Sequence, residues 1–170
     1  MSRQDAQSDA LRALLQSGFR YAFALTRQRC AAEDLLQDAW VAVLQAGGPR
    51  HRGYLFAAIR SRFLNVHRRE SLVSVVPLGD LDVEIADESA RADEDVVARI
   101  DAAQLESALS LLRPLEREAL YLAAVEEYTA QEIADLTRQP RGTVLSLIHR
   151  ARAKLRRALP APDSCGKLLP

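Results

Sequence analysis

The chain has 170 residues, of which 48% are hydrophobic, 27% charged and only 5% aromatic. No run approaches the roughly 20 consecutive apolar residues of a membrane span, and the N-terminal MSRQDAQSDA lacks the apolar core of a signal peptide. We therefore expect a cytoplasmic protein without stable membrane insertion. Because Ala, Leu, Arg, Gln and Glu dominate, we expect an all-α fold.

The formal net charge is zero, but the charges are segregated along the chain. Residues 1–70 carry 11 basic and 6 acidic residues, a net +5. Residues 71–98 carry 1 basic and 8 acidic residues (net -7), and residues 99–159 carry 10 and 8 (net +2). Two net-basic blocks on either side of an acidic strip favour a nucleic-acid partner more than the total charge does.

The first block predicts three helices from its apolar periodicity. They span Leu11 to Leu25, Ala31 to Gln45 and about Tyr54 to Glu70. Thr26 to Cys30 interrupts the pattern between the first two, and Gly47-Gly48-Pro49 ends the second. In the third helix apolar residues alternate with arginines, so one side should be core and the other cationic.

The periodicity fails from about Ser71 to Val96, where Pro77, Gly79 and an acidic run indicate a flexible linker. Beyond it we predict helices over Val97 to Leu111 and Leu115 to Val125, followed by a helix-turn-helix. The predicted architecture is two small helical domains joined by an acidic flexible linker. Its boundaries are residues 1–72, a linker at 73–96, residues 97–159 and a flexible tail at 160–170.

The helix-turn-helix is predicted over Thr129 to Leu159. Thr129 is followed three residues later by Glu132, which is the capping-box spacing. The chain should turn at 138–142, where Pro140 lacks an amide and Gly142 tolerates an unusual dihedral. We expect the second helix to start near Thr143.

On this second helix, helical spacing separates an apolar face from a polar one. The expected inward residues are Val144, Ile148, Ala151, Leu155 and Leu159, and the expected outward residues are Ser146, His149, Arg150, Arg156 and Arg157. An outward face of this kind suits a recognition helix, which presents hydrogen-bond donors to a groove and cations to phosphates. Leu145 and Leu147 fall on the flanks of the apolar stripe.

Catalytic and metal-site patterns are missing from the sequence. The three histidines form no zinc motif, Cys30 and Cys165 have no ligand spacing, and no Gly-rich phosphate loop is present. Glu126 and Glu127 are adjacent, so a helix would point them in different directions. We expect no enzyme activity, no cofactor and no metal site.

Two of these segments together resemble one family. The stretch AEDLLQD, from Ala32 to Asp38, is similar to the motif with which sigma factors dock on the clamp helices of the largest subunit of bacterial RNA polymerase. The helix-turn-helix is similar to the segment that reads the upstream (-35) promoter element. The chain thus resembles an extracytoplasmic-function (ECF) sigma factor of the sigma-70 family.

The resemblance implies three sets of site residues. The resemblance assigns polymerase binding to Asp34, Gln37 and Asp38, which share a helix face. The third predicted helix is similar to the segment that captures the melted downstream (-10) element. The residues carried over for that role are Tyr54, Arg60, Ser61, Arg62, Asn65, Arg68 and Arg69, and those for the -35 element are Arg141, Thr143, Ser146, His149, Arg150 and Arg152.

The chain departs from the family pattern at several of these positions. Ala57 stands where arginine is frequent and Ser61 where asparagine is usual, which alters the base contacts expected from the third helix. Leu145 and Leu147 replace common lysines or arginines. Either leucine could widen the core contact, touch a thymine methyl or form an apolar patch for a protein partner.

The resemblance implies an alternative sigma factor that directs promoter-specific transcription initiation with core RNA polymerase and promoter DNA, under the control of an anti-sigma factor. The alternative is a sigma-like interaction protein that binds an anti-sigma factor or polymerase with weak or no promoter binding.

The acidic linker is open to two interpretations: a solvated spacer, or a strip that mimics nucleic acid in the polymerase channel or shields the basic faces of the free protein.

Overall fold

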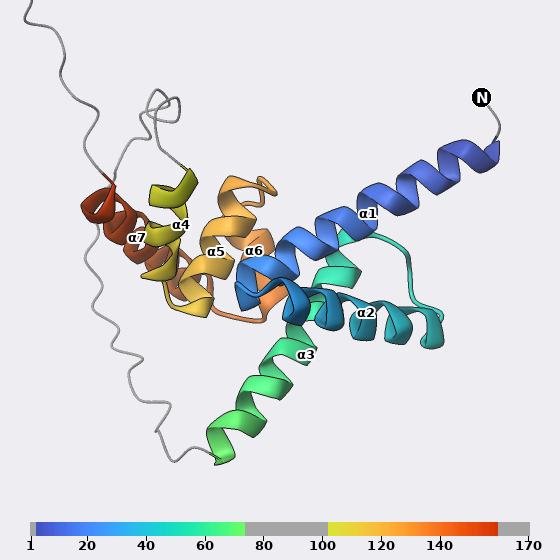
Figure 1. Ribbon diagram of the computed structural model, residues 1–170, viewed down its shortest axis with the longest axis horizontal. Coiled ribbons are helices and arrows are strands. Elements are labelled where there is room, and N and C mark those ends of the chain that lie inside the picture. Colours follow the sequence, from blue (N-terminus) through green and yellow to red (C-terminus); the bar gives the residue numbers. More distant parts are fainter. Residues whose placement is uncertain (1–2, 74–101, 160–170) are drawn as a thin grey trace, which may run out of the picture.

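A computed structural model of the chain describes residues 3–73 and 102–159. These residues form seven helices and no strand: α1 (Arg3–Thr26), α2 (Arg29–Gln45), α3 (Arg52–Val73), α4 (Ala102–Ser110), α5 (Pro114–Ala124), α6 (Ala130–Thr137) and α7 (Arg141–Ala158) (Figure 1). The all-α prediction is confirmed. The predicted linker after Val73, the start of the predicted helix at Val97 and the tail at 160–170 lie outside the described residues. No described helix is long and apolar enough to cross a bilayer.

Helices α1 to α3 form an N-terminal bundle. Its core includes Leu25, Leu35, Val43, Phe56 and Ile59, which were expected from the apolar periodicity. Helix α1 begins at Arg3 rather than at Leu11, and its first turns extend past the rest of the bundle (Figure 1). These turns carry mainly exposed residues, so apolar periodicity gave no signal for them.

The breaks between the first three helices have local causes. Arg27 adopts a left-handed conformation (φ 56°) after α1 ends, and the Thr26 hydroxyl donates to the Ala22 carbonyl. Gly47 (φ 61°) follows the C-cap of α2, and the amides of Gly47 and Gly48 donate back to the carbonyls of Leu44 and Val43. A left-handed glycine with such bonds is a common helix terminus, as the sequence predicted.

Helices α4 to α7 form a C-terminal bundle that contains the helix-turn-helix. The capping box at α6 is confirmed: the Thr129 hydroxyl accepts from the Glu132 amide, and the Glu132 carboxylate accepts from the Thr129 amide. The prediction for the turn was wrong in two details. The left-handed residue is Arg138 (φ 53°), the C-cap of α6, whereas Gly142 lies inside α7, which begins at Arg141 rather than near Thr143. Pro140 serves as its N-cap, because a proline needs no amide partner there.

The two bundles pack against each other through one continuous core. Helix α1 lies along α5, and α3 contacts α6 (Figure 1). At this contact Tyr21 stacks on Phe56 with ring centroids 4.4 Å apart and lies 6.0 Å from the ring of Tyr121. Leu122 of α5 and Ile133 of α6 are buried in the same apolar cluster. The described residues therefore form a closed arrangement in which the C-terminal bundle covers part of α1 and α3.

Candidate functional site

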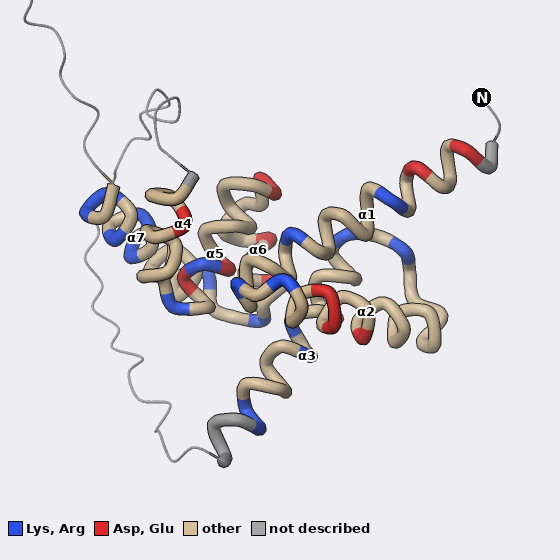
Figure 2. Tube along the Cα trace, in the orientation of Figure 1, with Lys and Arg blue, Asp and Glu red and all other residues tan. Residues whose placement is uncertain are grey.

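The outer face of α7 is the most cationic described surface of the helix-turn-helix. Arg141, His149 and Arg152 are exposed on it, and so are Arg156 and Arg157 near its end. Figure 2 shows this basic helix at the edge of the C-terminal bundle. The other predicted DNA-binding residues of α7, Thr143, Ser146 and Arg150, are half-buried. The Ser146 hydroxyl donates a hydrogen bond to the Gly142 carbonyl, and Arg150 Nε donates one to the Ser146 carbonyl.

The inner face of α7 agrees with the sequence at its centre. Val144, Ile148 and Ala151 are buried, while Leu155 and Leu159 are only half-buried. Leu145 and Leu147, for which the sequence allowed several roles, differ in burial. Leu147 is 7% exposed and belongs to the core, whereas Leu145 is 44% exposed on the outer face.

The three predicted polymerase-binding residues lie together on the surface of α2. Asp34, Gln37 and Asp38 are exposed, whereas the neighbouring Leu35 and Ala39 are buried in the core. The two aspartates line one side of a groove of about 750 Å³. The opposite side includes three predicted DNA-binding residues of α3, namely Arg62, Asn65 and Arg69.

Most predicted nucleic-acid residues of α3 are accessible. Ser61, Asn65, Arg68 and Arg69 are exposed, and Arg62 and Tyr54 are half-buried. The Tyr54 ring packs edge-on to His51, with centroids 6.2 Å apart. Arg60 differs from the others because its side chain is only 12% exposed and is held by the C-terminal bundle.

Glu118 of α5 is the partner of Arg60. Its carboxylate lies 2.9 Å from Arg60 Nε and also accepts a hydrogen bond from the Tyr21 hydroxyl of α1. Burial raises the pKa of Glu118, and Arg60 and Tyr21 oppose that shift by stabilising the charged form. Burial next to this carboxylate also raises the pKa of Tyr21 well above its ordinary value. The network joins α1, α3 and α5 through one oxygen.

A second buried carboxylate, Glu126, follows α5. Glu126 Oε1 accepts from Ser17 Oγ of α1 at 3.2 Å and from the Tyr121 hydroxyl at 2.8 Å. Its other oxygen lies 2.7 Å from Arg52 Nη1 of α3. Burial raises the pKa of Tyr121, as does its bond to Glu126. Its sequence neighbour Glu127 is exposed, so the two carboxylates point apart, although they lie between α5 and α6 rather than in a helix as expected.

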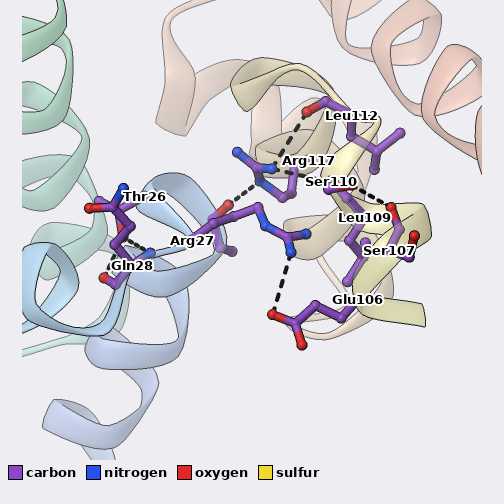
Figure 3. A network of polar contacts seen from close by, with 10 residues as sticks. Thr26, Arg27, Gln28, Glu106, Ser107, Leu109, Ser110, Leu112 and Arg117 are labelled. Carbon is purple, nitrogen blue, oxygen red and sulfur yellow. Dashed lines mark hydrogen bonds and ion pairs between the residues drawn. The ribbon is translucent and has the colours of Figure 1, made fainter. Parts of the chain in front are cut away.

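Arg117 of α5 also links the two bundles, but here the C-terminal bundle supplies the cation. Its guanidinium group caps the C-terminal end of α1. Its Nη2 donates to the Leu25 carbonyl at 3.2 Å, and its Nε donates to the Ala24 carbonyl. Its Nη1 donates to the carbonyls of Leu109 and Leu112 (Figure 3). Burial lowers the pKa of Arg117 to about 10, with a smaller effect of Arg27, and it remains a cation at neutral pH. Arg27 itself pairs with Glu106 of α4 at 3.6 Å, as Figure 3 shows.

The C-terminal bundle matches a family model. Residues 102–155 match the model described as Sigma-70, region 4. This span runs from the start of α4 almost to the end of α7 and contains the whole helix-turn-helix. The C-terminal bundle is therefore similar to region 4 of sigma-70 factors.

Two solved structures share the fold over nearly the whole chain. One is the sigma factor RpoE in complex with the anti-sigma factor NepR from Bartonella quintana, with a TM-score of 0.65 and 23% identity over 91% of this chain and 96% of that chain. The other is PhyRSL in the PhyRSL-NepR complex from Sphingomonas sp. Fr1, with a TM-score of 0.56 and 19% identity over 99% and 98%. The similarity therefore covers the fold of both bundles, including the part outside the region 4 match.

Sequence reasoning missed the residues by which region 4 holds the N-terminal bundle. Glu118, Glu126 and Arg117 look like ordinary charges of a solvated helix, and no motif singled them out. A weak signal is the adjacency of Arg117 and Glu118 to apolar positions of α5, which places them at the margin of its buried face. In the described residues no cluster of three or more His, Cys, Asp or Glu is placed to hold a metal ion.

Proposed function

We propose that the chain is an alternative sigma factor of the ECF group, which directs promoter-specific transcription initiation by bacterial RNA polymerase. The observation that carries this proposal is the combination of two open surfaces in one chain. One is the cationic outer face of α7 in region 4, and the other is the acidic face of α2. The function is regulatory rather than enzymatic, and its place is the cytoplasm, where polymerase works.

In this proposal residues 1–72 form sigma region 2 and residues 97–159 region 4, joined by the acidic linker at 73–96. Asp34, Gln37 and Asp38 bind the clamp helices of the largest polymerase subunit, where two exposed carboxylates favour a basic partner surface. Helix α7 enters the major groove of the -35 element. Its outer cations contact phosphates and base edges. The arginines of α3 hold the melted -10 strand, and Tyr54 offers a ring for base stacking.

The contact between the bundles implies an opening step. Glu118 and Glu126 pair with Arg60 and Arg52, so region 4 neutralises two cations of α3 while the chain is closed. A nucleic-acid phosphate would compete for the same guanidinium groups. We infer that polymerase binding separates region 4 from α3 and frees Arg60 for the -10 strand.

An anti-sigma factor is the proposed regulator. Both structural relatives were solved in complexes with NepR, which the first structure describes as an anti-sigma factor, and a similar protein is the partner class that this fold suggests. The same observation, together with the burial of Arg60, favours the second candidate function, a sigma-like interaction protein with weak or no promoter binding. Promoter binding by the complex with polymerase separates the two functions.

The test of polymerase docking uses the full chain and purified bacterial core polymerase. We expect a one-to-one complex with the wild-type chain and an affinity at least about tenfold lower for Asp34→Asn/Asp38→Asn, equivalent to about 1.4 kcal/mol. Asp9→Asn is the matched control, because Asp9 is an exposed acid on α1, away from α2. Equal polymerase affinity for both variants would remove α2 from the docking surface.

The test of promoter binding sequences the genomic fragments that the assembled complex retains. We expect enrichment of fragments that share an upstream element, and loss of that enrichment with Arg141→Ala/Arg152→Ala. Normal polymerase binding without enrichment of any sequence would favour the interaction protein instead.

A further inference from the structure

Leu145 occupies an unusual position on the region 4 surface. It is 44% exposed, while the other apolar residues in the first three turns of α7, Val144, Leu147 and Ile148, are buried. Arg141 lies one turn before it on the same face, and His149 lies one turn after it. The leucine is therefore a single apolar residue within a cationic face.

Gly142 lies three residues before Leu145 in α7 and is exposed to solvent. It lies within α7 with no positive φ, and a Cβ built on it would meet no atom within 4 Å. A glycine inside a helix is unfavourable compared with alanine, and neither the backbone conformation nor the packing of the chain requires one here. Gly142 is exposed, so the surface of α7 is open at this position, one turn before Leu145 and near the N-terminal end of the helix.

The N-terminal part of a recognition helix is the part that contacts base edges in the major groove. The methyl group of thymine is the apolar feature that standard DNA presents in that groove. The other base-edge features are hydrogen-bond donors and acceptors, and the leucine side chain has no group that could bond to them. A protein partner would be expected to need a larger contiguous apolar area than one leucine between cations. These arguments favour DNA over a protein as the ligand of Leu145.

We propose that Leu145, with the space left by Gly142, reads the 5-methyl group of a thymine in the upstream promoter element. This inference rests on the proposed sigma-factor function and adds a specificity determinant to it. The surrounding cations hold the phosphates, and the leucine adds a preference for a methylated pyrimidine at one position. Burial of one methyl group is worth about 0.8 kcal/mol, which corresponds to about a fourfold change in affinity.

The experiment uses the full chain assembled with core polymerase and a pool of promoter duplexes with a randomised upstream element. Each thymine of the selected element is then replaced singly by deoxyuridine, which removes only the methyl group. We expect one replacement to weaken wild-type binding about fourfold, and the Leu145→Ala variant to bind the thymine and uracil duplexes equally. Cytosine and 5-methylcytosine at that position provide a second comparison, in which methylation should strengthen wild-type binding.

Gly142→Ala is a second variant with opposite effects on folding and binding. Alanine should raise the melting temperature because it favours the helix, yet it should reduce the thymine preference by placing a methyl group in the open space at position 142. Selection of an element in which no thymine-to-uracil change affects wild-type binding would overturn the inference and leave the proposed function intact. So would a Leu145→Ala variant that keeps the preference but loses affinity for an anti-sigma factor. Failure to select any element would instead count against the proposed function.

Discussion

At the residue scale, neighbours in sequence have very different roles because a helix turns each of them toward a different environment. Leu145 and Leu147 could not be separated by sequence spacing, since both flank the apolar stripe of α7. Their exposure depends on how far α5 and α6 wrap around the helix, which is a property of the packed bundle. The sequence identified the central positions Val144, Ile148 and Ala151 because these lie in the middle of the stripe.

The two leucines provide a matched pair for measuring stability. Leu147→Ala should lower the free energy of unfolding by about 2–5 kcal/mol, because it leaves a cavity in the core. Leu145→Ala should change it by less than about 0.5 kcal/mol, as expected for a surface substitution. Urea unfolding of the two variants at pH 7 measures the difference. Similar losses for both would contradict the assignment of Leu145 to the surface.

The buried carboxylate of Glu118 gives a second residue-scale prediction. Glu118→Gln removes a charge that holds Arg60 and Tyr21, and hydrogen bonds to charged groups contribute about 1.5–3 kcal/mol each. We expect a loss of about 2 kcal/mol in urea unfolding. Glu127→Gln, at an exposed position, is the control and should be nearly neutral. A neutral Glu118→Gln would mean that this carboxylate contributes little to the closed form.

At the element scale, helix ends were predictable where capping chemistry is local. Thr129 with Glu132 and the glycines after α2 are signals within a few residues, and both predictions are confirmed. The turn before α7 was misassigned because a left-handed conformation was expected at a glycine, whereas Arg138 adopts it. The early start of α1 was missed for another reason: a helix without a buried face has no apolar period to detect.

Removal of the α6 cap should destabilise region 4. Thr129→Ala deletes the hydroxyl that accepts from the Glu132 amide, and loss of an N-cap typically costs about 1 kcal/mol. Gln131→Ala, on the exposed side of α6, is the control. Urea unfolding at pH 7 measures both, and a Thr129→Ala variant as stable as its control would show that the cap is dispensable.

The same cap predicts a pH dependence. Hydrogen bonds from the Thr129 backbone and side chain lower the pKa of Glu132 because they favour its charged form. The native state therefore binds this proton less readily than the unfolded chain. The resulting stabilisation is present above the unfolded pKa of about 4.3 and is lost as pH falls through the lowered folded pKa. Between pH 6 and pH 3 the loss of stability should be smaller in Glu132→Gln, which has no carboxyl group to titrate, and an unchanged acid-side slope would contradict this assignment.

At the scale of the whole molecule, the contact between the bundles was beyond sequence reasoning. Ser17 and Glu126 are 109 positions apart, and Tyr21 and Glu118 are 97 apart, so no local pattern connects them. The individual bundles follow from periodicity, but their relative placement depends on complementary surfaces. The acids of α2 and the outward residues of α7 were selected from the sequence and their roles stay predictions, whereas the burial of Arg60 under the C-terminal bundle had no signal in the sequence.

Weakening this contact should open the chain. In Glu118→Gln/Glu126→Gln the pairs with Arg60 and Arg52 lose their negative partners, which frees two cations of α3. We expect a larger radius of gyration by small-angle X-ray scattering and about tenfold tighter binding of single-stranded DNA, equivalent to about 1.4 kcal/mol. Glu127→Gln should match the wild type in both measurements. A more compact or unchanged double variant with unchanged DNA affinity would contradict the opening step.

The most direct test of the proposed function is run-off transcription with core polymerase on the retained genomic fragments. The sigma-factor account predicts a transcript of discrete length from the wild-type chain. It predicts a strong reduction with Asp34→Asn/Asp38→Asn and with Arg141→Ala/Arg152→Ala, and no transcript from core polymerase alone. Tight binding of the wild-type chain to polymerase without any specific transcript would contradict it.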